Sequence, residues 1–193
     1  MLKQFKNAVS LVVLLVTMTA SAWDTTPASV PVQKESSVSG KVQGRLSEVI
    51  QNLRSGQGAN SAEAIKYLQH VAGQGDQKAR AEALLWLGRA YRDGLAGTDK
   101  DLEIAFDYFE GAAGREGLNP EAQYELGRAY LNGEGTDRNL IAAYMWTELS
   151  LQAPSRTSSS AEAQKSKLAK MLNKAQLGKA QELLNQLKIL YLK

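Results

Sequence analysis

The chain has 193 residues, a formal net charge of +3, 44% hydrophobic residues and no cysteine. This length is typical of one domain of ordinary size. The absence of cysteine excludes disulfide bonds, thiolate catalysis, cysteine-bound zinc and anchoring through a lipid-modified cysteine.

Residues 1–22 have the pattern of a secretory signal peptide. Lys3 and Lys6 form a positive start, an apolar stretch covers residues 8–20, and a small-x-small cleavage motif ends at Ala22. The apolar stretch is shorter than the roughly 20 residues that a membrane-spanning helix needs. We therefore expect cleavage near Ala22 and a periplasmic or secreted protein; retention as an uncleaved anchor is the alternative. Removing the two lysines lowers the net charge to +1, which indicates no nucleic-acid partner.

The segment 23–44 is rich in Ser, Thr, Pro and Val and has no sustained periodicity. Such a segment buries too little apolar surface to offset its ordering entropy, so we predict a flexible linker. From Arg45 onward the pattern is helical, and the repeat domain is expected to cover residues 45–193. Its first unit, residues 45–75, is degenerate, with helices predicted near 45–54 and 61–73.

Two copies of the sequence Leu-Gly-Arg-Ala-Tyr define an internal repeat. They occupy residues 87–91 and 126–130, which are 39 positions apart, and the flanking residues also match. Repeats of this period are typical of stacked arrays. We expect the two units to cover residues 76–117 and 118–153.

Each unit is predicted to be a helical hairpin. On its first helix, apolar residues recur at spacings of three and four, which places them on one stripe. Gly94 and Gly97 then end the helix and turn the chain. Asp101 in the first copy and Asn139 in the second are expected to cap the following helix by accepting hydrogen bonds from its free backbone N–H groups. Such a hairpin buries its stripe only against a neighbouring unit.

Gly88 and Gly127 lie in the middle of the first helix of each copy. Glycine costs about 1 kcal/mol relative to alanine at such a position. Because both copies bear this cost at the same place, we predict that a partner helix approaches closely there. Ala105 in the first unit and Ala143 in the second are expected on the facing side of that helix.

The C-terminal part is predicted to close the array. A loop covers residues 154–160, and capping helices within 160–192 are expected near 161–172 and 174–190. The segment 161–193 contains seven lysines and two glutamates, a net charge of +5. A solvated helix face explains this charge; contact with an acidic partner or with anionic lipid is the alternative.

Three patterns that could carry chemistry fail on inspection. His70, the single histidine, has no base, nucleophile or metal ligand near it in the sequence. The acidic residues from Asp93 to Glu103 lack the order of an EF-hand loop. Gly133 and Gly135 follow a predicted helix rather than a strand, unlike a dinucleotide-binding loop. The sequence therefore predicts no catalytic residue, no cofactor and no metal site.

The repeat residues resemble the Sel1-like repeat, a relative of the tetratricopeptide repeat. The resemblance rests on Leu-Gly-x-x-Tyr-x-x-Gly at residues 87–94, on Asp101, and on Ala-Phe-x-Tyr-Phe-x-x-Ala-Ala at residues 105–113. It implies an all-α fold, a short right-handed superhelical solenoid of antiparallel helix pairs.

The resemblance also implies a function, because exported members of this family are known as adaptors. It favours a non-enzymatic periplasmic adaptor that mediates protein–protein interaction, with an envelope complex or a membrane sensor as partner. The alternatives are a structural assembly component of the flagellar-motor or polysaccharide-export type, and a cell-wall-acting enzyme or binder. A cysteine-rich branch linked to penicillin binding is not matched, since this chain has no cysteine.

A partner-binding groove is expected along the first helix of each unit. One stripe of that helix packs, and the neighbouring stripe is free to line the groove, as in tetratricopeptide relatives. Tyr and Arg are enriched where binding energy concentrates, although an ordinary solvated face is the alternative. The predicted groove residues are Glu82, Leu85, Arg89, Arg92, Tyr124, Arg128 and Leu131.

Overall fold

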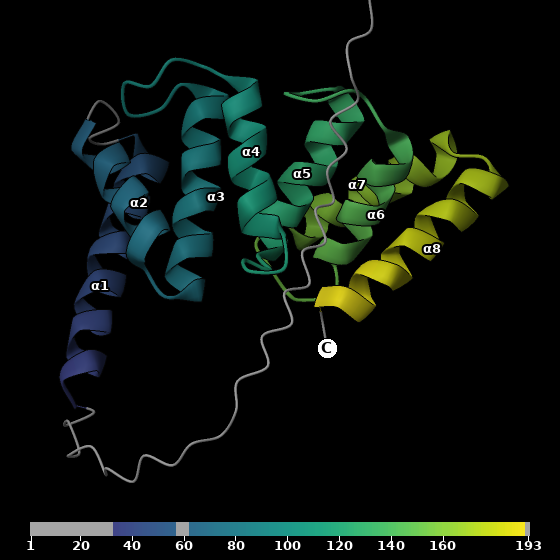
Figure 1. The fold of residues 1–193 in the computed structure, drawn as a ribbon. Helices are drawn as coiled ribbons and strands as arrows, with labels where there is room; N and C mark the ends of the chain where they lie inside the picture. The colour runs from purple at the N-terminus through teal and green to yellow at the C-terminus, as the bar shows by residue number, and fades with distance from the viewer. Residues whose placement is uncertain (1–32, 57–61, 192–193) are drawn as a thin grey trace, which may run out of the picture. The chain divides into compact units, whose positions relative to one another are not determined.

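The computed structural model describes residues 33–56 and 62–191, and it describes side chains from residue 40 to residue 190 within these ranges. The described residues form eight α-helices and no strand, all within one compact unit (Figure 1). The predicted signal peptide and the first part of the predicted linker lie outside them. The helices are α1 (Gln33–Ser55), α2 (Ala62–Gln74), α3 (Gln77–Asp93), α4 (Leu102–Ala113), α5 (Pro120–Asn132), α6 (Leu140–Ser150), α7 (Ser158–Met171) and α8 (Lys174–Tyr191).

Helix α1 corrects the predicted linker boundary. The linker is expected to reach Gly44, but the helix already begins at Gln33. The reason is tertiary: Val42 packs against the core, and its carbonyl oxygen accepts a hydrogen bond of 3.1 Å from the Tyr67 hydroxyl of α2. Once this part of α1 is anchored, the helix can extend without a second nucleation step. Each residue added to it then gains one backbone hydrogen bond. Local composition alone does not reveal such an anchor.

The ends of the repeat helices follow the predicted signals. Asp101 accepts a hydrogen bond of 2.9 Å from the Ile104 backbone N–H, and Asn139 accepts two, from Ile141 and Ala142. Gly94 ends α3 in the left-handed region with φ of 70°, a conformation that favours glycine. The predicted caps and the predicted stop at Gly94 are therefore confirmed.

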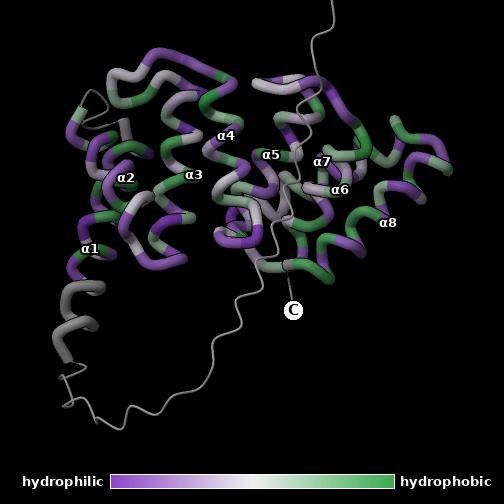
Figure 2. The backbone as a smooth tube through the Cα atoms, viewed as in Figure 1, coloured by the Kyte–Doolittle hydropathy of each residue, from purple (hydrophilic) through white to green (hydrophobic). Residues whose placement is uncertain are grey.

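The helices pack in sequence order, so the apolar core runs along the array. Within the units α3 packs on α4 and α5 on α6, and between the units α2 packs on α3 and α4 on α5. Figure 2 shows hydrophobic and hydrophilic segments alternating along the helices, as expected for elements that bury one stripe. The side chains buried most deeply include Leu46, Leu68, Leu87, Phe109 and Leu126.

The two mid-helix glycines do permit close packing, and the nearest atoms belong to residues that the sequence did not single out. A Cβ atom added to Gly88 would lie 2.6 Å from Cε1 of Phe109, and one added to Gly127 would lie 2.6 Å from Oγ1 of Thr147. The buried Ala105 lies one turn before Phe109, and the Ala143 carbonyl oxygen is the third atom met by Gly127, at 3.1 Å. The contact falls one helical turn further along the partner helix.

The last two helices close the array. Helix α6 packs against both α7 and α8, and Leu168, Ala180 and Leu184 are buried in these contacts. The exposed end of α8 carries Ile189 and Leu190, which are 56% and 61% exposed. Among the described helices, none combines the length and apolar character needed to cross a membrane.

Candidate functional site

Side chains of the odd-numbered helices meet along one surface of the array. The Arg54 guanidinium of α1 lies 5.0 Å from the centre of the Trp86 ring of α3. From α3, Arg89 binds Glu121 of α5 at 3.1 Å, and Arg156, just before α7, binds the same Glu121 at 2.9 Å. We call this surface the odd-helix face. It consists of Arg54, Trp86, Arg89, Arg92, Asp93, Glu121, Tyr124, Glu125, Arg128, Glu134, Arg156, Gln164 and Lys167.

The centre of the odd-helix face is an ion-pair network around Glu125. This carboxylate accepts hydrogen bonds from Arg89 at 3.1 Å, from Arg92 at 2.7 Å and from Arg128 at 3.1 Å. The Glu125 side chain is only 6% exposed. A carboxylate withdrawn from water to this degree needs paired cations to remain charged. Arg89 and Arg92 therefore link α3 of one repeat to α5 of the next, while Arg128 pairs with Glu125 within α5.

The margins of the network are more open. Arg92 also pairs with Asp93, and Arg128 pairs with Glu134 at 2.9 Å. Although burial opposes the charged form, the hydrogen bonds to Asp93 and the charge of Glu125 raise the pKa of Arg92 above its ordinary value. Burial likewise opposes ionisation of Asp93, but its hydrogen bond with Arg92 and the charge of that residue lower the pKa of the carboxyl. Both groups are thus fixed in their charged forms.

Two of the predicted groove residues are buried. Leu85 is 1% exposed and packs in the core with Phe109, and Leu131 is 6% exposed and belongs to a buried cluster that includes Leu168 and Ala180. Neighbouring side chains therefore cover most of both residues, although Leu131 still lines a hollow on this surface. Glu82 is half-buried.

Tyr124 and Arg128 line a real hollow. It has a volume of about 390 Å³ and lies between α5 and α7, with Gln164 and Lys167 on its other wall and Leu131 at its edge. Tyr124 is half-buried, whereas Lys167 is exposed. The structure thus brings Tyr124, Arg128 and Leu131 together, and it places Arg89 and Arg92 nearby in the network. Partner binding by any of these residues stays a prediction.

The comparison with family models matches the Sel1 repeat at residues 81–114 and again at 120–153. The chain contains two Sel1 repeats. The first comprises most of α3 and all of α4, and the second comprises α5 and α6, so the ion-pair network joins one Sel1 repeat to the other.

A solved structure has the same fold. The chain is similar to the crystal structure of a protective antigen present in uropathogenic Escherichia coli strains, which displays an SLR fold; the TM-score is 0.67 and the identity 23%. The match covers 82% of this chain and 32% of that one, so this chain spans about a third of its length. At this identity the likeness shows the fold alone, an all-α solenoid. No curated protein matches the chain significantly.

Sequence reasoning missed part of the site that connects the Sel1 repeats. It did not single out Glu125, Trp86 or Arg156. One signal was present: Glu121 and Glu125 are four residues apart on α5, and Arg89 and Arg92 are three apart on α3, so each pair lies on one stripe of its helix. Arg156 gave no signal, because it lies in a loop whose path depends on the packing of α6 and α7.

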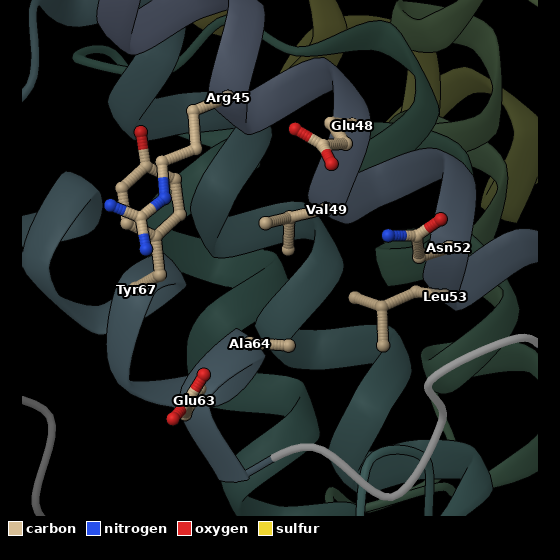
Figure 3. A pocket seen from close by; sticks show the side chains of 8 residues that line it. All are labelled: Arg45, Glu48, Val49, Asn52, Leu53, Glu63, Ala64 and Tyr67. Atoms are coloured by element: carbon tan, nitrogen blue, oxygen red, sulfur yellow. The ribbon is translucent and has the colours of Figure 1, made fainter.

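A second hollow lies before the first Sel1 repeat, between α1 and α2. It has a volume of about 310 Å³ (Figure 3). Figure 3 shows Val49, Leu53 and Ala64 directed toward it, while the Arg45 guanidinium stacks 4.5 Å from the centre of the Tyr67 ring at one side.

Metal chemistry has no support in the described part of the chain. No group of three or more His, Asp or Glu side chains is arranged to hold a metal ion there. His70 is exposed on α2. Gly133 and Gly135 turn the chain in the left-handed region between α5 and α6, where the repeat pattern places a turn.

Proposed function

We propose that this chain is a non-enzymatic periplasmic adaptor that binds a protein partner along the odd-helix face. Sel1 repeat proteins generally mediate protein–protein interaction, and their fold is typically a non-catalytic scaffold. The observation that carries the proposal is the hollow between α5 and α7, where Tyr124 lies among Arg128, Gln164 and Lys167. A half-buried aromatic ring surrounded by long polar side chains is a common anchor for a partner. The partner class that we propose is an envelope complex or a membrane sensor.

The periplasmic location rests on the first 22 residues. Their positive start, short apolar stretch and small-x-small motif are the features of an exported chain. The partner is then a protein of the cell envelope.

Site-specific photocrosslinking of the full chain in intact cells tests this proposal. A photoreactive phenylalanine analogue replaces Tyr124 in one variant and the exposed Asp107 of α4 in the control. We expect a discrete adduct, recovered from the periplasmic fraction, at position 124 and none at 107. Adducts of equal yield at both positions, or a chain that stays in the cytoplasm, would contradict the proposal.

Assembly through the last helix is the second candidate function. It is favoured by the exposed Ile189 and Leu190, which lie beside Lys188 at the end of α8. In this case the chain is a structural component that associates through α8 or touches the membrane there. An adduct at position 189 without one at 124 would favour it over the adaptor.

A further inference from the structure

The odd-helix face as a whole carries more positive than negative charge, because its six cationic side chains outnumber its four carboxylates and the neighbouring Glu82. The least compensated end is the one with Arg54. Arg54, Arg89 and Arg156 cluster there around Glu121, which already pairs with both Arg89 and Arg156. Glu82 is the other carboxylate close enough to act on Arg54. Among the described residues, Arg54 forms no ion pair of its own. Arg89 is also bound by Glu125, so Arg54 is the described cation at this end that has no carboxylate of its own.

Arg54 is placed by stacking rather than by a carboxylate. Its Cζ lies 5.0 Å from the centre of the Trp86 ring, and Cζ of Arg89 lies 5.0 Å from the same centre. The Trp86 Nε1 is buried and has no hydrogen-bond acceptor within the described part of the chain. The cluster thus has a surplus of hydrogen-bond donors as well as of positive charge.

Burial and the neighbouring arginines outweigh the two carboxylates near Arg54, Glu121 and Glu82, which act in the opposite sense. Partial burial lowers the pKa of its guanidinium, and the positive charge of Arg156 lowers it further. The Arg156 side chain is itself 58% exposed, so a ligand can reach it. A group of opposite charge at this point would relieve the repulsion between the two arginines.

We propose that the partner segment bound by the odd-helix face is an acidic peptide, and that Arg54 and Arg156 bind its carboxylates. This inference rests on the function proposed above and specifies the chemistry of the partner. Guanidinium groups bind carboxylates with two parallel hydrogen bonds, which gives direction as well as charge complementarity. The carboxylate oxygens only accept hydrogen bonds, and this end of the face offers only donors in excess.

A third cation, Lys167 of α7, extends the complementarity along the face. Lys167 is exposed, forms no ion pair with any described residue, and lines the hollow that contains Tyr124. Glu121, which binds Arg156, and Tyr124 are three residues apart on α5. An acidic segment that begins at Arg54 and Arg156 therefore continues past the Tyr124 ring toward Lys167.

A peptide fits this face better than an anionic membrane does. Among the described residues, the large exposed apolar side chains are Ile104, Met171, Ile189 and Leu190. Three of them lie on the even-numbered helices α4 and α8, and Met171 is the last residue of α7. None belongs to the odd-helix face, so this face offers no side chain for insertion among lipid tails.

Binding of labelled hexaglutamate to the full chain tests the inference. The test variant is Arg54→Gln with Arg156→Gln. The matched control, Lys78→Gln with Arg115→Gln, also loses two charges, at exposed positions that form no ion pair with described residues. By fluorescence anisotropy at low salt, we expect the test variant to lose at least about tenfold in affinity and the control to stay within about twofold. Thermal melts of both variants should match that of the parent chain, because all four substituted side chains are exposed and Glu121 keeps its ion pair with Arg89.

The other outcomes are decisive too. Equal loss in both variants would show unspecific charge attraction, and no binding of hexaglutamate to the parent chain would also overturn the inference. Binding to phosphatidylserine vesicles in its place would identify a lipid surface as the ligand. The crosslink at position 124 separates the two proposals: if it persists in the Arg54→Gln, Arg156→Gln variant, the face binds a partner that is not held through its acidic groups. If no crosslink forms even in the parent chain, the adaptor function itself is wrong.

Discussion

The two Sel1 repeats contain the same five residues, yet the glycine of each copy meets a different neighbour. Gly88 of the first repeat packs against the ring of Phe109, whereas Gly127 of the second packs against Thr147. Phe109 and Thr147 occupy equivalent positions of α4 and α6, 38 residues apart. The repeat therefore determines where the helices approach closely, and the identity of one residue determines whether that contact is apolar or polar.

The difference follows from what comes next in the chain. The Thr147 hydroxyl donates a hydrogen bond to the Ala143 carbonyl at 2.6 Å and accepts one from Nε2 of Gln164 at 2.7 Å. Gln164 belongs to α7, a capping helix that lies outside the two matched segments. The second repeat thus uses a buried polar contact to bind the end of the array. The first repeat, followed by another repeat, fills the same place with an aromatic ring.

Double-mutant cycles at the two glycines give the strongest test of this difference between the repeats. Gly127→Leu should lower the free energy of unfolding by about 3 kcal/mol, because the new side chain meets the backbone N of Thr147, which is 3.0 Å from an added Cβ. Thr147→Ala should not relieve this cost. Gly88→Leu should be costly as well, but Phe109→Ala should offset part of it, with a coupling energy of about 1–3 kcal/mol.

Chemical denaturation of the four single and two double variants measures both couplings. Asp107→Ala, on the exposed side of α4, is the control for an unchanged fold. A coupling energy at Gly127 and Thr147 as large as that at Gly88 and Phe109 would contradict this expectation. It would show that the α6 backbone moves away from the new side chain as readily as the Phe109 ring does.

The equivalent arginines of the two repeats should also differ, with a smaller effect. Arg89 is 13% exposed and binds Glu121 and Glu125, whose side chains are 11% and 6% exposed. Its equivalent Arg128 is 25% exposed and shares Glu125 with two other arginines. We expect Arg89→Gln to lower the free energy of unfolding by about 2 kcal/mol and Arg128→Gln by less than about 1 kcal/mol. If urea denaturation shows equal losses of unfolding free energy for both variants, the different burial of Arg89 and Arg128 has no effect on their contributions to stability.

The smallest expected effect is a loss of stability at alkaline pH. Burial, and then the charge of Glu110, raises the pKa of Tyr130 from its ordinary value of 10.0. The folded protein therefore holds this proton more tightly than the unfolded chain does. The stabilisation is complete below pH 10 and is lost as the pH rises through the higher pKa of the folded state. Tyr130→Phe should reduce the decline in unfolding free energy above pH 10; an equal decline in both proteins would refute this assignment.

Much of the local structure could be predicted from the sequence. The helix pairs of both repeats, the caps at Asp101 and Asn139 and the stop at Gly94 all follow from residues within a few positions of one another. Hydrophobic periodicity and capping are local effects, so they can be recognised without knowing the fold. The start of α1 was mispredicted because its anchor, the bond from Tyr67 to Val42, joins residues 25 positions apart.

The candidate site, too, was predicted from the sequence only in part. Helical phase identified Arg89, Arg92, Tyr124 and Arg128 as one surface of the repeats, but it did not reveal that Glu125 binds three of the four. It also placed Leu85 on that surface, although the fold buries it.

The sequence by itself determined the period, the helices and their ends, because these depend on the few residues around each position. Only the tertiary structure decided which stripe of α3 remains accessible, which carboxylate receives the arginines, and which atoms meet Gly88 and Gly127. The contacts of Gly88 with Phe109, of Gly127 with Thr147 and of Arg89 and Arg92 with Glu125 each join residues 20 or more positions apart. Their distances depend on how one helix pair is stacked on the next, and that stacking results from the summed packing of many side chains rather than from any single motif.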